Sequence, residues 1–235
     1  MIKDELIQRS PVRVFEQSIH GGLAAGELGL IASQSGIGKT SVLVQIALDK
    51  LLQAKKVIHV SFTQHTDYVL AWYENIFAEF IKNENLENTG DIKNELIKNR
   101  VLMNFNQEGI TTDQILRSLK ALIRDGDFKA ESLIVDGFDF TRGTHEHFAA
   151  VKEFAKELGL SVWYSCNVKG EHSPKQDIPS LIKDYVDLLD VVMVLDPKQD
   201  YIALSVSKDR DAYFSAQSET AALRLDPRTL LILEG

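Results

Sequence analysis

Short apolar runs alternate with longer amphipathic patterns along most of this chain, and this alternation constrains the fold more than any other feature. Strands are predicted where branched and aromatic residues cluster, at residues 28–32, 57–62, 101–104, 132–136, 161–165 and 191–195. Helices are predicted where apolar residues recur every three or four positions, at residues 39–53, 67–81, 112–123 and 145–158. Repeated alternation of strand and helix predicts an α/β fold with a mostly parallel central sheet and helices on both faces.

The pattern changes after residue 190, where strands follow one another without helices. They are predicted at residues 201–207, 222–225 and 230–233, and Asp-Pro turns at residues 196–197 and 226–227 separate them. The sheet is therefore expected to end in C-terminal antiparallel hairpins. Two polar segments, residues 83–99 and 168–179, are predicted to be surface loops. The second follows a core strand, where substrate-contacting loops lie in open α/β sheets, and an ordinary solvated loop is the alternative.

Length, charge and cysteine content set the class of protein. A chain of 235 residues can bury one sizeable core, so a single domain over residues 1–235 is expected. The 26 basic and 34 acidic residues leave a formal charge of −8, which repels nucleic acid and anionic membranes unless a local basic patch overrides it. Cys166 is the single cysteine, and no apolar stretch reaches the roughly 18 residues of a membrane helix. We expect a cytoplasmic protein without a membrane partner.

The segment of residues 29–41 reads GLIASQSGIGKTS, a strand that enters a loop of small residues and then opens a helix. It meets the pattern G-x-x-x-x-G-K-[ST] except at the first position, where Ser33 replaces glycine. Small residues let successive backbone N–H groups surround a phosphate, and the helix N-terminus adds a positive field. We therefore expect a nucleotide-binding loop made of Ser33, Gln34, Ser35, Gly36, Ile37, Gly38, Lys39, Thr40 and Ser41.

Within this motif the chemistry of phosphoryl transfer predicts separate roles. Lys39 is expected to reach the β- and γ-oxygens of ATP, and Thr40 to place its hydroxyl on Mg²⁺. Asp136 ends a hydrophobic strand and is the candidate second magnesium ligand, through water, so Lys39 and Asp136 are catalytic candidates. Asp139 is the alternative, although a turn residue stabilising Gly137 explains it as well. A glycine-rich turn without a ligand does not explain a lysine placed against the helix dipole.

The chain resembles the RecA-like P-loop NTPases of the branch that includes RadA, KaiC and the DnaB-type helicases, from about residue 10 onward. Residues 21–31, GGLAAGELGLI, resemble the G-G-L-x-x-G-E-L-x-x-I lead-in of that branch, and residues 160–195 resemble its strand, loop, helix and strand in order. The resemblance implies a RecA-like fold and a preference for ATP, and no guanine-reading N-K-x-D motif is present. Cys166 stands where the helicases carry a glutamine that senses the γ-phosphate, and Asn167 is a candidate replacement.

Residues 204–210, LSVSKDR, resemble the K-x-R segment that ring-forming members extend to a neighbouring subunit. The resemblance implies that Lys208 and Arg210 act in trans on the γ-phosphate held next door, where two cations neutralise transferring charge. Spacing alone would indicate a solvated strand end. The implied assembly is a ring, such as a hexamer, or a filament, built from copies of this chain or from related subunits, because a head-to-tail contact repeats until it closes.

One departure from that branch bears directly on catalysis. Active members carry a glutamate that deprotonates the attacking water, and this chain has Thr63 at that position, followed by Gln64. Neither side chain accepts a proton readily at neutral pH. His65 and Asp67 are candidate substitutes, but each lies further along the chain. Whether the protein is an ATPase is therefore left open by the sequence.

Three functions remain. The first is a module in which ATP and Mg²⁺ control oligomer assembly or a regulatory conformation while hydrolysis is slow or absent. The second is an ATP-driven motor on nucleic acid, opposed by the missing glutamate and the net charge; a basic stripe from Lys169, Lys175 and Lys183 would favour it. The third is a relic that acts only through protein interactions, and the intact loop residues argue against it.

Overall fold

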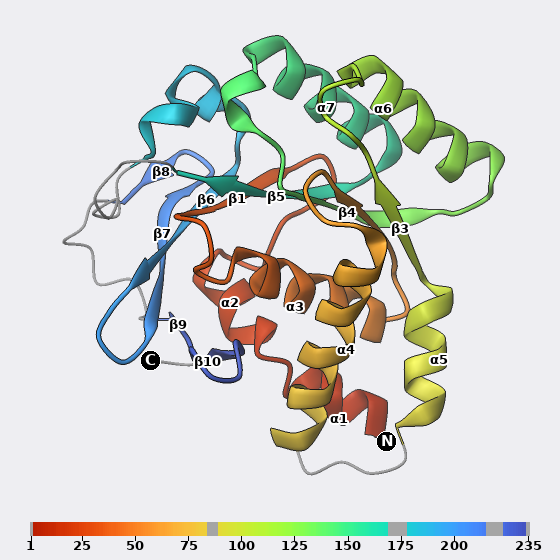
Figure 1. The fold of residues 1–235 in the computed structure, drawn as a ribbon, viewed down its shortest axis with the longest axis vertical. Coiled ribbons are helices and arrows are strands. Elements are labelled where there is room, and N and C mark those ends of the chain that lie inside the picture. The colour runs from red at the N-terminus through yellow and green to blue at the C-terminus, as the bar shows by residue number, and fades with distance from the viewer. Residues whose placement is uncertain (1, 84–88, 169–177, 215–222, 234–235) are drawn as a thin grey trace.

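One large mixed sheet runs through the molecule between two layers of helices (Figure 1). The computed structural model describes residues 2–83, 89–168, 178–214 and 223–233. In these residues ten strands pair in the order β10-β9-β7-β6-β1-β5-β4-β2-β3, with β8 also paired to β7. The strands are β1 (Leu28–Ser33), β2 (Lys56–Ser61), β3 (Arg100–Asn104), β4 (Ala130–Asp136), β5 (Ser161–Asn167), β6 (Val191–Pro197), β7 (Ile202–Asp209), β8 (Ala212–Tyr213), β9 (Leu223–Leu225) and β10 (Ile232–Leu233).

Strands β1 to β6 are parallel, and the strands that follow are antiparallel, so the protein is an α/β fold with a mostly parallel sheet. Strand β1 lies between β5 and β6, and all six of its residues are buried. In the register of the sheet, Leu28 of β1 lies beside Val162 of β5, and Leu30 of β1 lies beside Val192 of β6. A strand enclosed on both faces needs a continuous apolar run, which is what the sequence supplies there.

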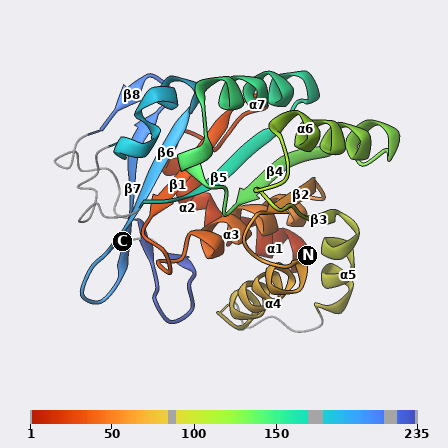
Figure 2. The same ribbon diagram turned by 45° about the horizontal axis from the view of Figure 1, so that its top comes forward.

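The helices divide between the two faces of the sheet (Figures 1 and 2), with α6 and α7 on one side and α1 to α5 on the other. Leu119 of α6 and Phe148 of α7 belong to one buried cluster, whereas Phe15 of α2 and Leu43 of α3 belong to the second. The helices are α1 (Ile2–Gln8), α2 (Val12–Ser18), α3 (Lys39–Leu52), α4 (Thr66–Asn83), α5 (Gly90–Lys98), α6 (Thr112–Lys120) and α7 (His145–Leu158), with a π-turn η1 (Ala121–Asp125) and 3-10 segments η2 (Phe140–Arg142) and η3 (Ser180–Leu188).

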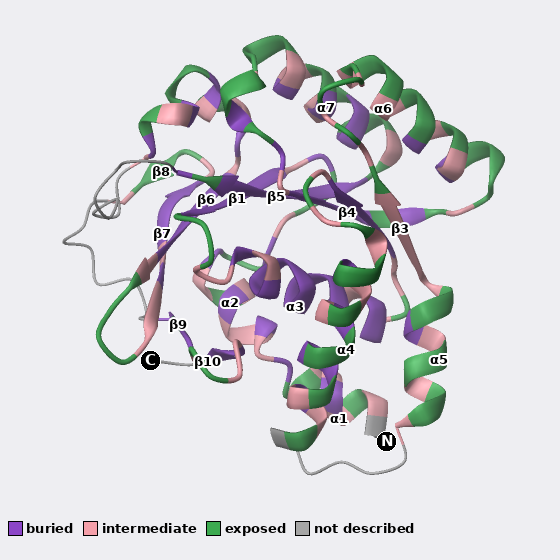
Figure 3. Ribbon diagram, viewed as in Figure 1, coloured by how far each residue is buried: buried purple, intermediate pink, exposed green. Residues whose placement is uncertain are grey.

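Helix α3 is the most enclosed helix of its layer, and Figure 3 shows it buried beneath the central strands. Every position in it is buried except Thr40 and Lys50. A helix that is buried on nearly all sides is fixed by packing around its whole circumference. The N-terminal end of α3 is therefore held rigidly at the carboxyl end of β1.

The predicted elements agree with the structure over most of the chain. All nine predicted strands are found, the longest differences at an end being two residues, and the C-terminal hairpins are antiparallel as expected. The four predicted helices correspond to α3, α4, α6 and α7, and the last turn of α6 continues as the π-turn η1. No helix among the described residues is long and apolar enough to span a membrane.

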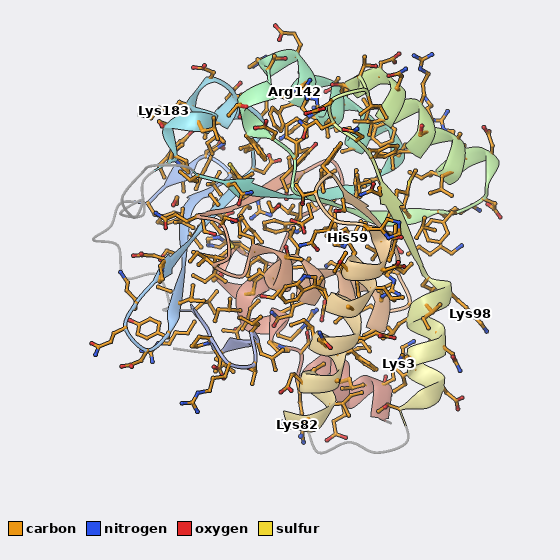
Figure 4. The ribbon with its side chains drawn as sticks, in the orientation of Figure 1. Lys3, His59, Lys82, Lys98, Arg142 and Lys183 are labelled. Atoms are coloured by element: carbon orange, nitrogen blue, oxygen red, sulfur yellow. The ribbon has the colours of Figure 1, made fainter. Side chains whose placement is uncertain are left out.

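Two predictions need correction or lie outside the described residues. The segment 83–99 was expected to be a loop, but residues 90–98 form α5, whose buried residue Leu96 anchors it to the core. The short helices α1 and α2 were not predicted at all. Residues 169–177 of the second predicted loop are not described, so the contributions of Lys169 and Lys175 to a basic stripe lie outside the description. Lys183, labelled in Figure 4, lies on η3 at the periphery.

Candidate functional site

A cavity of about 310 Å³ opens at the carboxyl edge of the parallel strands. Four chain segments and two isolated side chains form its wall, and most of the lining groups are polar. Ligands of open α/β sheets bind at this edge, because loops after the strands meet there. The lining residues are Ser35, Gly36, Gly38, Lys39, Thr40, Thr63, Gln64, Trp72, Asp136, Gly137, Ser165, Asn167 and Leu230.

The loop between β1 and α3 turns through two glycines with left-handed backbone angles. Gly36 and Gly38 have φ angles of 80° and 111°, in the left-handed region that glycine adopts without strain. A Cβ atom at Gly38 would also lie 2.6 Å from Leu225, so both backbone angle and space require glycine there. The residues other than glycine with positive φ in the described chain are His20, Ala54, Asp127, Arg210 and Leu230. Ser33 is not among them, so the first position of the loop does not require glycine.

The remaining loop residues support the same turn. The Ser41 hydroxyl donates to the Gly38 carbonyl at 2.7 Å, and the Ser33 hydroxyl donates to the Gln34 carbonyl at 2.9 Å. Ile37 is partly buried against the core and anchors the loop. The first N–H groups of an α-helix have no acceptor within the helix, and Gly38, Lys39 and Thr40 at the start of α3 line the cavity. This end of the helix can therefore donate hydrogen bonds to an anion.

Lys39 places its ammonium group beside this loop. The Nζ atom donates to the Ser33 carbonyl at 3.1 Å, the Ser33 hydroxyl at 3.0 Å and the Gln34 carbonyl at 2.7 Å. The residue is only 7% exposed. Burial lowers the pKa of Lys39 to about 8, and the neighbouring Cys166 and Asp136 act in the opposite direction. The result is a cation that is held close to the cavity with a pKa well below that of an ordinary lysine.

Thr40 and Asp136 are 96 positions apart in the sequence but are in contact in the fold. The Thr40 hydroxyl donates to Asp136 Oδ2 at 2.8 Å, and the Ser165 hydroxyl donates to Oδ1 at 2.5 Å. Ser165 in turn accepts a hydrogen bond from the Gly137 N–H at 2.9 Å, which fixes the chain after β4. A hydroxyl and a carboxylate are hard oxygen ligands, so this pair fits Mg²⁺, which keeps several waters and binds through few protein groups. No cluster of three or more potential metal-ligating side chains occurs in the described chain.

Asp139, the alternative to Asp136, lies elsewhere. Its Oδ1 atom accepts hydrogen bonds from the Thr141 N–H at 3.1 Å and the Thr141 hydroxyl at 2.7 Å, so it caps the short segment η2. The residue does not line the cavity. The structure therefore gives Asp139 the turn role and leaves Asp136 beside Lys39 and Thr40.

The segment after β2 holds the four residues considered for the role of catalytic base, and only some of them lie at the cavity. Thr63 and Gln64 line the cavity. His65 and Asp67 have side chains 68% and 85% exposed, pair with each other at 3.2 Å, and are not among the lining residues. On β5, Cys166 is fully buried within the sheet, whereas its neighbour Asn167 is exposed and lines the cavity. The polar groups that face the site here are therefore hydroxyl and amide groups.

Lys208 and Arg210 lie at the opposite edge of the sheet from Lys39. Lys208 pairs in register with Val192 at the start of β6, and the Arg210 N–H donates to the Asp190 carbonyl. Both side chains are bound within the chain, Lys208 to main-chain carbonyls of η3 and the residue after it, and Arg210 to a set of acceptors near β1. Neither contributes to the cavity of its own chain, and their role in trans stays a prediction.

Three lining residues were not singled out from the sequence. Trp72 comes from α4, Ser165 lies in the last half of strand β5, and Leu230 precedes β10. The Leu230 carbonyl accepts a hydrogen bond from the Gln45 side chain of α3 at 2.8 Å, and the same side chain accepts one from the Ile232 N–H at 2.8 Å. These two hydrogen bonds, here called the Gln45 clamp, bring the C-terminal hairpin to the site. No local sequence pattern predicts them.

Comparison with known proteins identifies no family. No protein-family model matches the sequence, and a search of curated proteins finds no match. The parallel strands, the glycine-rich turn and the network of Lys39, Thr40 and Asp136 are therefore the basis for assigning a function.

Proposed function

We propose that this protein is a P-loop module of the RecA-like kind that binds ATP with Mg²⁺, and that bound nucleotide controls oligomer assembly or a regulatory conformation while hydrolysis is slow. One observation carries the proposal: Lys39, Thr40 and Asp136 converge on a single cavity at the N-terminus of a buried helix. A turn that only precedes a helix does not explain a buried lysine at this position, because the positive N-terminal end of the helix dipole repels the ammonium group.

Each part of the site has a role toward a triphosphate. The backbone N–H groups of the loop and of the first turn of α3 would bind phosphate oxygens. Lys39 would exchange its bonds to the Ser33 and Gln34 carbonyls for bonds to phosphate, which bears a full charge and is the stronger acceptor. Thr40 and Asp136 would hold Mg²⁺, directly and through water. When bound, the metal supplies positive charge that neutralises the phosphates.

The described lining of the cavity offers no evident general base, which favours slow hydrolysis. Of the described residues that line it, Asp136 is the only carboxylate, and both of its oxygens accept hydrogen bonds from Thr40 and Ser165. A carboxylate engaged in this way stabilises a metal site rather than accepting a proton from water. Without another base, ATP would remain bound long enough to stabilise one state of the protein, which is the requirement for a nucleotide-controlled assembly.

The proposal is tested by titrating the wild-type protein with ATP in the presence and absence of Mg²⁺, following nucleotide binding, oligomeric mass and phosphate release in one sample. We expect Mg²⁺-dependent binding, a change in mass and little release. Rapid release that depends on nucleic acid would instead support a motor. The absence of any binding of ATP or ADP would refute the proposal and leave the chain as an interaction protein.

The lowered pKa of Lys39 predicts a pH dependence of ATP binding. The free protein loses the Lys39 proton as pH rises through about 8, whereas an ordinary lysine stays charged up to about pH 10. Because phosphate binds the charged form, affinity is expected to fall as pH rises above about 8, approaching tenfold for each further pH unit. Binding measured by calorimetry between about pH 7.5 and 9.5 checks this. Lys39→Arg, whose guanidinium stays charged, serves as the control and should show a flat profile in the same range.

A further inference from the structure

Ser165 lies beside Asp136 at the carboxyl end of the parallel sheet, on the face that α3 covers. Val135 of β4 and Tyr164 of β5 are in register, so the residues that follow them, Asp136 and Ser165, are neighbours. Successive side chains of a strand point to opposite faces of the sheet. Trp163 belongs to the buried cluster on the α3 face and Tyr164 to the cluster on the other face, so Ser165 shares the face of Trp163. The Ser165 hydroxyl therefore meets Asp136 on the side from which α3 approaches.

The proton of the Ser165 hydroxyl is committed to one oxygen of that carboxylate. The hydroxyl donates to Asp136 Oδ1 at 2.5 Å and accepts a hydrogen bond from the Gly137 N–H at 2.9 Å. Because a backbone N–H can only donate, the hydroxyl proton is left for Asp136. Ser165 is 3% exposed and Asp136 is 4% exposed, so little water competes for this bond. The Oδ1 atom is therefore held on the β5 side of the carboxylate.

The second oxygen of Asp136 lies on the side of Thr40. The Oδ2 atom accepts a hydrogen bond from the Thr40 hydroxyl at 2.8 Å, and Thr40 lines the cavity at the start of α3. The two oxygens thus have separate partners from separate elements of the fold. The carboxylate cannot turn both oxygens toward one ion without breaking the bond from Ser165. A group that fixes a metal-binding carboxylate in this way acts on the metal through that carboxylate.

The ions Mg²⁺ and Ca²⁺ place different demands on a carboxylate. Mg²⁺ is small, gives up its waters reluctantly and binds proteins through few carboxylate oxygens. Ca²⁺ takes about six to eight oxygen ligands and often uses both oxygens of one carboxylate. Asp136 is the only carboxylate among the described residues that line the cavity. The number of Asp136 oxygens that can reach the ion therefore affects Ca²⁺ more than Mg²⁺.

We propose that Ser165 is a positioning residue that makes the nucleotide site selective for Mg²⁺ over Ca²⁺, an inference that rests on the proposed nucleotide site. By holding Oδ1, Ser165 leaves Asp136 one oxygen to offer beside Thr40. One such oxygen suffices for an ion that keeps its waters, and an ion that needs more protein oxygens is bound less well. In this role Ser165 acts on the ion only through Asp136.

The test uses Ser165→Ala and Ser165→Thr in the full chain, with Ser161→Ala as the matched control. Ser161 is buried on the same strand, but its hydroxyl donates to the Glu131 carbonyl at 3.3 Å and the Ser132 hydroxyl at 3.2 Å, and it does not line the cavity. Calorimetry measures the affinity for a non-hydrolysable ATP analogue with saturating Mg²⁺, with saturating Ca²⁺ and with a chelator. Saturating metal removes the metal preference of the nucleotide itself, and thermal unfolding without nucleotide verifies that each variant is folded.

We expect the wild type to bind the analogue more tightly with Mg²⁺ than with Ca²⁺, and Ser165→Ala to reduce this preference about 10-fold while the affinity without metal is unchanged. Ser165→Thr keeps the hydroxyl, so it should keep the wild-type preference, as should Ser161→Ala. A merely structural loss would weaken all three affinities together. Equal weakening, or an unchanged preference, in folded Ser165→Ala protein would therefore overturn the role of Ser165. A wild type that binds the analogue with neither metal would instead overturn the nucleotide site itself, and this inference with it.

Discussion

Replacing Lys39 with alanine is expected to weaken the binding of ATP by about 100-fold or more. A hydrogen bond to a charged group contributes about 1.5–3 kcal/mol, and each 1.4 kcal/mol is a factor of ten in affinity. Lys39 is buried beside the glycine-rich loop and would meet two phosphates, so its loss removes more than one such bond. Isothermal titration of Lys39→Ala and wild-type protein with ATP and Mg²⁺ measures the difference directly.

Lys50→Ala is the matched control for this experiment, because Lys50 lies on the same helix but pairs with Glu16 away from the cavity. Its loss should leave nucleotide affinity unchanged. The Lys39→Ala protein should also keep its fold, since the charge that is removed is one that burial already disfavours. An affinity change below about threefold in folded Lys39→Ala protein would contradict the assignment of the phosphate loop.

The sequence predicted the parts of the fold that local patterns encode strongly. Strand β1 is a six-residue buried run followed by the small residues of the loop, and α3 is a long apolar pattern, so their order and boundaries were readable. Helix α5 was missed because it has few apolar positions, of which Leu96 is the buried one. Helices α1 and α2 have seven residues each, too few for a periodic pattern to stand out.

Residues of the candidate site could be predicted only where a sequence motif contains them. The loop and Asp136 were found because small residues and a carboxylate occur at fixed places relative to strands. Ser165 and Leu230 reach the site through the pairing of β5 and through the Gln45 clamp, both of which depend on contacts between residues far apart in sequence. The difference between Gln64 and His65 likewise depends on which side chain turns inward, and spacing does not reveal that.

Arg210→Ala is expected to lower the free energy of unfolding by about 2–3 kcal/mol in the absence of nucleotide. The Arg210 guanidinium uses all of its N–H groups within the chain: it donates to the Ile19 carbonyl at 2.7 Å, the Gly22 carbonyl at 2.6 Å, both oxygens of Glu27 at 3.2 and 2.8 Å, and Asp209. Removing one partner of a buried ion pair costs about 3–5 kcal/mol, and partial exposure of Arg210 reduces that figure. Urea denaturation followed by circular dichroism gives the change.

This result bears on whether Arg210 can act on a neighbouring subunit, as its resemblance to a K-x-R segment implies. A guanidinium that joins the residues before β1 to the end of β7 would have to give up several charged bonds to reach a phosphate in trans, so its structural role should appear in the unassembled chain. Arg117→Ala is the control, because Arg117 is exposed and forms an ion pair with Asp113 one turn away, where such a pair contributes little. If Arg210→Ala unfolds like the wild type but loses nucleotide-dependent hydrolysis, and mixing it with Lys39→Ala restores that activity, then the arginine acts between subunits and its bonds in the isolated chain are exchanged on assembly.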